Sequence, residues 1–341
     1  MRARKHIAKR ELAAWMCVRT GITGVLERIP KRRGLMVLSY HRIGNPSETS
    51  YDPSLFSATA EQFEFQIRHL KRHSHIISLD EALHQAGSAD GAGGAGVLMT
   101  FDDGYLDNYT QAFPILKSYG IPAVFFLPTA FIGTGRLPWW DVIAYILKHS
   151  RRKTIELHGP ELVKFSLDDG DLRATIRRVL SMFKQSCAQE ERFISDLENQ
   201  CDCPRPQGER ERRFLNWEEA VEMQESGMAF GSHTHSHEIL AGLSPEQQYA
   251  ELVQSREILE RQLRRPIDVL AYPVGGRNTF SAETTQAVER AGYRWAFSNY
   301  GGYNVSGRIS RFDIHRFGCP DPLPGCFRLQ MSIGGLTGAH F

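Results

Sequence analysis

Short apolar runs recur along the chain, and most are followed by a stretch with the apolar spacing of a helix. The runs have the composition of buried strands and lie at 35–40, 97–101, 123–127, 228–231, 269–272 and 295–297. The intervening helical patterns lie at 63–70, 109–119, 217–226 and 282–291. Repeated β-then-α units predict a mostly parallel sheet or barrel, with functional residues at the carboxyl ends of its strands.

One helix has an explicit start signal. Ser244 can cap the amino end, Pro245 suits the first helical position, and Gln247 stands three residues after the cap. We expect this helix to run to about Arg264 and to stop before Pro266. It separates two of the predicted strands, as the β-then-α order requires.

Residues 138–213 interrupt the short-period rhythm. They are polar, rich in charge and mostly helical in pattern. The predicted organisation is therefore a basic amphipathic segment at 1–33, a barrel domain at 34–330 with a helical insertion at about 138–213, and a C-terminal tail at 331–341. We interpret this stretch as an insertion or lid between barrel units and not as an independent catalytic domain.

Charge is concentrated at the beginning of the chain. The net charge of the whole is only +2, which gives no general electrostatic case for nucleic-acid binding. Residues 1–33 nevertheless hold ten Lys and Arg against Glu11 and Glu27, so the remainder is net acidic. Trp15, Val18 and Ile22 follow helical spacing here, continued by Val25 and Ile29. One interpretation is a helix lying on an anionic membrane surface, and the other is a helix packed on the domain with a solvated basic face.

Location follows from what the sequence lacks. No run approaches the roughly 18–20 apolar residues of a membrane span. The apolar run at 12–18 is too short and too poorly bounded for a convincing signal peptide. The expectation is a cytoplasmic protein with reduced cysteines, in contact with the inner membrane face if the first interpretation of residues 1–33 holds.

Two motifs carry candidate chemistry. Asp102 and Asp103 stand side by side at the end of a predicted buried strand. Two neighbouring carboxylates repel each other, so the stability of the fold gives little reason for both to be present. Three histidines, His233, His235 and His237, follow another predicted strand. One Asp and two His make a facial ligand set that leaves metal positions open, while the second carboxylate can act as a base. The pattern indicates a metal-dependent hydrolase, and spacing alone leaves open which histidines are ligands.

With these motifs in place, the chain resembles the polysaccharide deacetylase family over roughly residues 35–320. Thr100-Phe-Asp-Asp-Gly104 is similar to the family's first motif and His233-Thr-His-Ser-His237 to its second. The resemblance implies a distorted (β/α) barrel and metal-dependent removal of acetyl groups from N-acetylated sugars. It also implies that Asp102 is the general base and that Asp103, His233 and His237 bind the metal, which leaves His235 as a neighbour.

The chain departs from the family in two places. The family's third motif carries an arginine that orients the base, whereas this sequence reads Ala271-Tyr-Pro-Val-Gly275. Arg277 lies close enough in sequence to substitute for that arginine, and the alternative is an exposed loop arginine. The family's last motif, Leu-x-x-His, supplies a general acid near the C-terminus, where His315 fits it poorly. Leu38-Ser-Tyr-His41 fits it well near the N-terminus, so we expect a permuted barrel in which His41 is the acid.

The expected reaction is therefore direct hydrolysis of an N-acetyl group on an oligo- or polysaccharide, free or lipid-linked. Zinc is the first expectation for the divalent metal, although Asp-His-His also suits iron, cobalt or nickel. Tyr272 and the backbone N–H of Val274 are candidates for substrate contact, and Trp139 and Trp140 either stack on sugar or anchor the insertion. The alternatives are hydrolysis of a non-sugar amide or imide, and a catalytically silent carbohydrate-binding protein.

Overall fold

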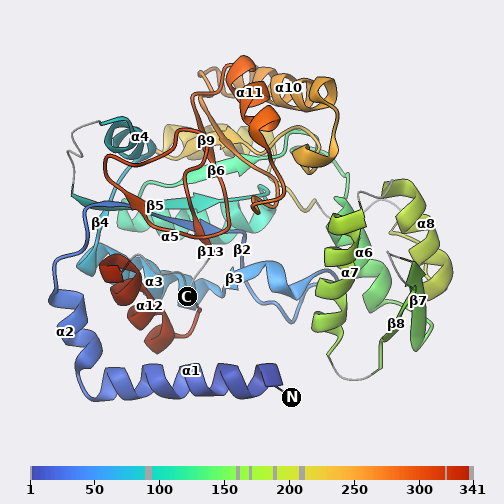
Figure 1. The fold of residues 1–341 in the computed structure, drawn as a ribbon, viewed down its shortest axis with the longest axis horizontal. Coiled ribbons are helices and arrows are strands. Elements are labelled where there is room, and N and C mark those ends of the chain that lie inside the picture. Colours follow the sequence, from blue (N-terminus) through green and yellow to red (C-terminus); the bar gives the residue numbers. More distant parts are fainter. Residues whose placement is uncertain are drawn as a thin grey trace. The chain divides into compact units, whose positions relative to one another are not determined.

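The computed structural model describes residues 2–88, 94–158, 162–168, 171–186, 190–206, 212–318 and 321–337 (Figure 1). The chain divides into two compact units. The first comprises Met1–Gly44, Ser57–Ile132 and Phe214–Phe341, and the second comprises Asn45–Phe56 and Gly133–Arg213. The predicted basic segment, barrel and tail therefore share one unit.

The first unit is built on a curled, mostly parallel sheet. Its central strands follow the spatial order β11-β10-β9-β6-β5-β1, and each neighbouring pair is parallel. The strands are β1 (Gly34–Tyr40), β4 (His75–Ile76), β5 (Ala95–Phe101), β6 (Val124–Leu127), β9 (Ala229–Ser232), β10 (Val269–Ala271), β11 (Trp295–Phe297), β12 (Asn304–Val305) and β13 (Phe317–Gly318). All residues of β1 and β6 are buried, as their continuous apolar sequences predict.

A C-terminal segment joins the two ends of this sheet. Ile314 pairs with Phe297 at the end of β11, while β13 runs parallel to β1 with Leu38 opposite Phe317. The segment from Ile314 to Gly318, which we call the closing segment, thus bonds to both edge strands. The predicted distorted (β/α) barrel is confirmed.

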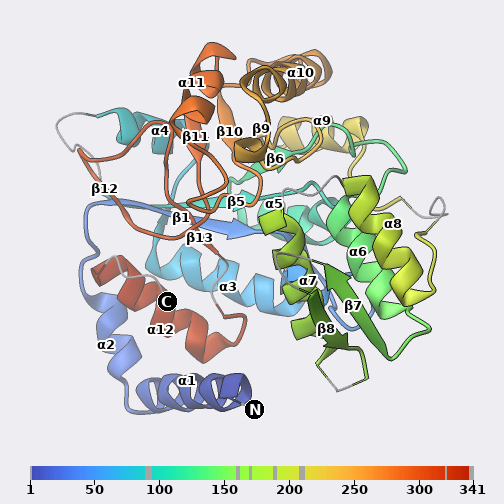
Figure 2. The ribbon, with the colours of Figure 1, turned by 45° about the vertical axis from the view of Figure 1, so that its right-hand side comes forward.

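Helices connect and surround the strands, as Figures 1 and 2 show. Those of the first unit are α1 (Arg2–Arg19), α2 (Ile22–Arg28), α3 (Ala60–His73), α4 (Leu79–Gly87), α5 (Phe113–Tyr119), α9 (Trp217–Glu225), α10 (Pro245–Leu263), α11 (Ala282–Arg290) and α12 (Pro324–Thr337). The predicted start of α10 is confirmed, because Ser244 and Gln247 form a reciprocal capping box. A π-helical turn at Asn108–Ala112 leads into α5.

The second unit is less purely helical than the sequence suggested. It contains α6 (Trp139–Lys148), α7 (Leu172–Ser186) and α8 (Glu190–Cys201), but also an antiparallel hairpin of β7 (Thr154–His158) and β8 (Leu162–Ser166). The prediction missed the hairpin because its short strands lie among charged residues, which favoured a helical interpretation of the insertion. The short strands β2 (Arg42–Ile43) and β3 (Phe56–Ala58) pair with each other.

The two ends of the chain meet on one side of the first unit. Helix α12 contacts α1, α2 and α3, and both ribbon views show it beside them. It continues through Thr337 with Met331 buried, so the boundary predicted at 330 for a C-terminal tail is wrong, and only 338–341 lie beyond the described helix. Within the described chain, no helix is long and apolar enough to cross a bilayer.

Candidate metal centre and active site

The aspartate pair is held at the carboxyl end of β5. The Asp102 N–H donates to the Tyr40 carbonyl at 2.9 Å, which continues the parallel pairing of β5 with β1. Asp103 then turns the chain with φ 72°, and Gly104 follows with φ 67°. A Cβ at Gly104 would lie 2.7 Å from the Leu127 side chain, so this tight turn requires glycine. The turn directs two successive carboxylates into the same buried region.

The histidine loop follows β9 and is fastened by α10. The carboxylate of Glu251 accepts hydrogen bonds from the N–H groups of His235 and Ser236, at 3.0 and 2.8 Å. Thr234 and His237 both have positive φ, at 63° and 62°. Non-glycine residues held in this conformation are uncommon and often occur at functional sites, so the loop is shaped for something other than packing.

Three side chains from these two motifs converge. The candidate ligand atoms of Asp103, His233 and His237 all lie within 4.8 Å of one another, and all three residues are buried. Asp103 Oδ1 is 3.4 Å from His237 Nε2 and 3.7 Å from His233 Nε2. Two imidazoles and one carboxylate at this separation suit a divalent transition metal.

His233 is oriented for such a role. Its Nδ1 lies 2.7 Å from the Ala271 carbonyl, which can only accept, so Nδ1 carries the proton and Nε2 has the lone pair. Burial, partly offset by Asp102, lowers the pKa of His233 to about 4 and keeps the ring neutral. A neutral imidazole anchored through its other nitrogen is the usual arrangement of a metal-binding histidine.

Asp102 is held by an arginine that the sequence analysis did not identify. Arg316 donates from its two terminal nitrogens to the two Asp102 oxygens, at 2.7 and 2.9 Å, and neither residue is exposed by more than 1%. The same guanidinium donates to the Ser298 carbonyl and contacts Thr100. Burial alone would raise the pKa of Asp102, but Arg316, with His233 and His41, holds it well below its usual range.

Of the two alternatives for Arg277, the structure agrees with the exposed loop arginine and not with a substitute for the family's motif arginine. Arg277 is exposed and lies over the Tyr300 ring, 4.2 Å from its centroid. Arg316 reaches Asp102 because the closing segment crosses the barrel end between β11 and β1. The available signal was a lone arginine between Ile314 and Phe317, two apolar residues that the sheet buries.

His41 lies beside the aspartates. Tyr40 pairs with Phe101 in the β1–β5 register, so His41 stands next to Asp102, and its Nε2 is 4.0 Å from Asp102 Oδ2. Its carbonyl accepts from Asn108 at 2.7 Å. The structure thus brings the end of β1 to the predicted site, as the permuted order requires.

His315 occupies different surroundings. Its Nε2 is 3.0 Å from the Tyr300 hydroxyl and 3.6 Å from Asp313, and its ring packs against Gly302. Although Arg316 is its sequence neighbour, adjacent residues of an extended segment point to opposite sides. The candidate role of His315 at this centre is not supported.

The remaining candidates are divided. His235 uses both ring nitrogens on the protein, near Thr129 at 2.8 Å and Gln254 at 3.1 Å, as expected of a neighbour. Tyr272 is fully buried, with its hydroxyl donating to the Phe312 carbonyl, so its predicted contact with substrate is wrong for this conformation. Val274 follows β10 with φ 62°, another strained position close in sequence to the carbonyl that orients His233.

The two tryptophans belong to the second unit. Trp139 and Trp140 are almost completely buried and make an edge-to-face pair, and Trp139 also packs on Phe183. These contacts attach α6 to α7 within the second unit, so the two rings pack inside the insertion. Neither ring has an exposed face on which a sugar could stack, so the structure does not support the sugar-stacking alternative.

Comparison with known proteins agrees with these motifs. The model of the family described as polysaccharide deacetylase matches residues 90–296, which is more than half of the chain and includes both motifs. The chain belongs to the polysaccharide deacetylase family.

Individual relatives are distant. A Bacillus subtilis protein, YxkH, named as a polysaccharide deacetylase, is 24% identical over 198 residues, covering 58% of this chain and 42% of the relative. The poly-beta-1,6-N-acetyl-D-glucosamine N-deacetylase of Staphylococcus aureus is 28% identical over 177 residues, covering 49% of this chain and 58% of the relative. The match thus spans about half the length of these curated relatives.

Solved structures share the fold. The deacetylase PplD of Streptococcus pyogenes superimposes with a TM-score of 0.55 at 20% identity, covering 85% of this chain and 93% of that one. IcaB from Ammonifex degensii gives a TM-score of 0.53 at 19% identity, covering 84% and 91%. At these sequence identities, the structural similarity establishes the deacetylase barrel fold and does not identify the substrate.

Proposed function

We propose that this protein is a metal-dependent hydrolase that removes N-acetyl groups from an N-acetylated sugar or polysaccharide. The observation that carries the proposal is the joint placement of two devices. Asp103, His233 and His237 converge as a ligand set, and Asp102, beside them, is kept ionised by Arg316. A cation site next to an ionised carboxylate suits hydrolysis of an unactivated amide.

The proposed cofactor is one divalent cation bound by Asp103, His233 and His237. Zinc is the first choice, and iron, cobalt and nickel also match two imidazoles and a carboxylate. When bound, the cation polarises the acetamide carbonyl and makes water more acidic. Three protein ligands leave room for water and substrate, whereas a structural zinc site is normally closed by four.

The chain's own groups supply the proton transfers. Asp102 accepts the proton of the attacking water, since its carboxylate is ionised and fixed in orientation by Arg316. His41 is proposed to protonate the departing amine, because an unprotonated sugar nitrogen leaves poorly. The backbone N–H of Val274 is the proposed partner of the developing oxyanion. Of these proposed roles, that of Asp102 as the base is supported by the largest number of hydrogen bonds and ion pairs.

The proposed substrate class is a chain containing N-acetylglucosamine, either free or lipid-linked. The named activity of the Staphylococcus aureus relative, on poly-beta-1,6-N-acetyl-D-glucosamine, supports this class. A non-sugar amide or imide is the alternative reaction. A silent carbohydrate-binding protein is disfavoured by Asp102, because a binder has no need for a buried, ionised carboxylate beside a ligand set.

Acetate release tests the proposal directly. Purified protein reconstituted with zinc, iron, cobalt or nickel is incubated with N-acetylated oligosaccharides, lipid-linked N-acetyl sugars and simple non-sugar amides. We expect acetate from sugars, loss of release with chelator and recovery on adding metal. The variant Asp102→Asn is the control for the base, because it replaces the proposed base with a neutral group of nearly the same size and leaves the three proposed ligands unchanged. Turnover of non-sugar amides alone would favour the alternative reaction, and binding of sugars without acetate would favour the silent protein.

A further inference from the structure

The two N-terminal helices expose apolar side chains on one face each. In α1, Leu12, Trp15 and Met16 stand at positions i, i+3 and i+4, and Trp15 is 57% exposed. In α2 and its C-terminal cap, Ile22, Val25 and Ile29 repeat at helical spacing, and Val25 is 61% exposed. Among the described residues, six of the eight large hydrophobic side chains classed as exposed lie here. We call these six residues the apolar face.

The apolar face is not needed to hold the helices in place. The opposite side of α1 carries Ala14, which is 2% exposed and packs with Val18 close to Gly325 of α12. In α2 the buried residue is Thr23. Each helix therefore has a packed side and a second apolar side that faces solvent. Isolated exposed hydrophobic residues are ordinary, but three on one side of each of two consecutive helices indicate an interaction surface.

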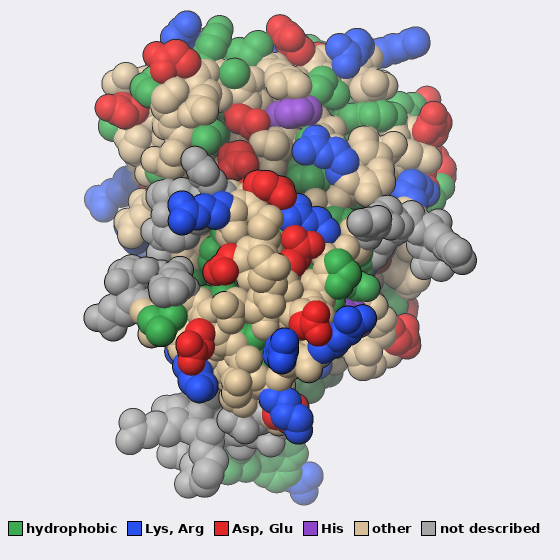
Figure 3. Space-filling view, turned by 90° about the vertical axis from the view of Figure 1, so that its right-hand side faces the viewer, with side chains coloured by type: hydrophobic (Ala, Val, Ile, Leu, Met, Phe, Trp, Pro, Cys, Tyr) green, Lys and Arg blue, Asp and Glu red, His purple; other side chains and the backbone are tan. Residues whose placement is uncertain are grey.

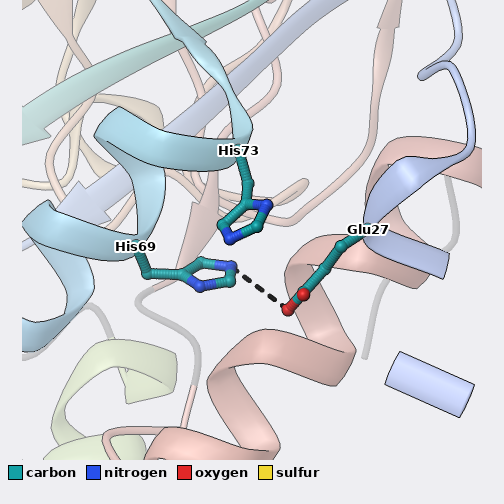
Figure 4. A group of neighbouring side chains, drawn as sticks. All are labelled: Glu27, His69 and His73. Carbon is teal, nitrogen blue, oxygen red and sulfur yellow. Dashed lines mark ion pairs between the residues drawn. The ribbon is translucent and has the colours of Figure 1, made fainter. Parts of the chain in front are cut away.

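A partly buried polar cluster joins α2 to the helices beside it, and Figure 4 shows its members Glu27, His69 and His73. Glu27 accepts from Arg328 of α12 through both carboxylate oxygens, at 2.7 and 2.9 Å, and lies 3.8 Å from His69 of α3. Glu27, His69 and His73 lie close enough to share a cation. We assign the cluster to helix docking, because Arg328 already neutralises the carboxylate and would repel a cation.

The same cluster removes one of the two acidic side chains of residues 1–33 from the surface, and the other, Glu11, is partly buried. Its acidic member turns inward, so Glu27 contributes no negative charge beside the apolar face. Arg19, Arg28, Arg32 and Arg33 are exposed on or directly after the same two helices, and the Arg19 guanidinium lies 5.3 Å from the Trp15 ring centroid. Apolar side chains bordered by arginines, with tryptophan among them, are the composition of helices that lie in an anionic membrane interface.

We propose that the apolar face and its arginines form a docking surface for an anionic lipid membrane. The aliphatic and tryptophan side chains enter the headgroup–acyl boundary while the arginines bind lipid phosphates. Figure 3 shows a different face of the molecule, on which acidic and basic side chains are interspersed. The hydrophobic side chains on that face, drawn in green, are mostly separated from one another. This step rests on the proposed function. A deacetylase docked on a membrane would meet N-acetyl sugars presented there, so the docking surface points to lipid-linked chains as substrates.

Vesicle flotation tests the surface without relying on activity. The full-length protein is mixed with vesicles of phosphatidylglycerol and phosphatidylcholine, or of phosphatidylcholine alone, at low and high salt. We expect flotation with the anionic vesicles, weakened by salt. Trp15→Glu with Val25→Glu should lower partitioning at least tenfold. The matched control is Leu162→Glu on β8, where an exposed leucine of the second unit receives the same substitution.

Each contrary outcome is informative. Absence of wild-type flotation, or equal flotation of the double variant, would overturn the proposal. Wild-type dimers in light scattering that the double variant abolishes, without vesicle binding, would instead assign the face to a second copy of the chain. Acetate release from a soluble oligosaccharide should be the same in all three proteins. A double variant that keeps this release and fails to float separates the membrane surface from the proposed chemistry.

Discussion

Replacing Arg316 is the most discriminating perturbation of the proposed active site. Arg316→Met keeps most of the buried volume but removes both charge-assisted bonds to Asp102. Breaking one side of a buried ion pair costs about 3–5 kcal/mol, because the other charge remains uncompensated. If that cost falls on the ionised base, kcat/KM falls on the order of 10²–10⁴-fold at neutral pH. Arg316→Lys retains a charge but not the two-pronged geometry, and should lose roughly 10–100-fold.

The pH dependence follows from the direction of the pKa shift. In the intact protein the pKa of Asp102 lies below its usual range. The fall of kcat/KM on the acidic side of the pH profile should therefore occur at low pH. Without Arg316, burial raises that pKa, and the acidic limb moves to higher pH. The stabilising effect of a depressed pKa is present above the carboxyl's unfolded pKa and is lost as pH falls through the folded one. The stability difference between wild type and Arg316→Met should therefore narrow in acid.

The assay is acetate release across a pH series, with metal content measured on every sample. Arg277→Met is the control, since it removes an exposed arginine that stacks on Tyr300 and does not contact the base. An Arg316→Met protein that is folded and metal-loaded and keeps the wild-type kcat/KM and pH profile would refute the assignment. Loss of metal in that variant would instead give Arg316 a role in the ligand set.

Three further predictions concern individual groups. Asp103→Ala should lose bound metal and turnover while thermal unfolding still shows a folded protein, and full metal occupancy would contradict the ligand assignment. Asp102→Asn should keep the metal and lose turnover, so equal metal loss would mean that both aspartates bind the cation. His41→Gln should cost about 10²–10⁴-fold in kcat for an amide and less for an ester, with metal content unchanged. His315→Gln should change kcat little for either substrate. If His315→Gln instead lost turnover and His41→Gln kept it, the hypothesis of a permuted barrel with His41 as the acid would be rejected.

The sequence predicted best what is local in the chain. A buried strand that ends in paired aspartates, or in a histidine cluster, carries its chemistry within a few residues, and parallel β-then-α order implies that such ends meet. The placement of His41 also followed, because a strand from either end of the chain can pair with β5. These inferences needed only periodicity, residue type and the resemblance to a family.

What the sequence did not predict depends on contacts between distant segments. Arg316 lies 214 positions from Asp102, and nothing in its immediate neighbourhood marks it as a partner of a carboxylate. Tyr272 looked like a substrate contact until its hydroxyl was found bonded to Phe312. The apolar spacing of residues 12–29 indicated an amphipathic segment, but only the packing of Ala14 and Val18 distinguishes the docked side from the exposed one.

The closing segment has a consequence for the order in which the site forms during synthesis. Asp102 and the three proposed ligands have been synthesised by His237, and the groups that hold the histidine loop, Glu251 and the Ala271 carbonyl, follow by residue 271, but Arg316 comes a further 45 residues later. Until Ile314 and Phe317 have paired with β11 and β1, Asp102 has no arginine beside it, and burial favours its neutral form. A nascent or C-terminally truncated chain can therefore possess all the proposed ligands while its proposed base, Asp102, is still neutral, so we expect hydrolytic competence only after the closing segment has paired.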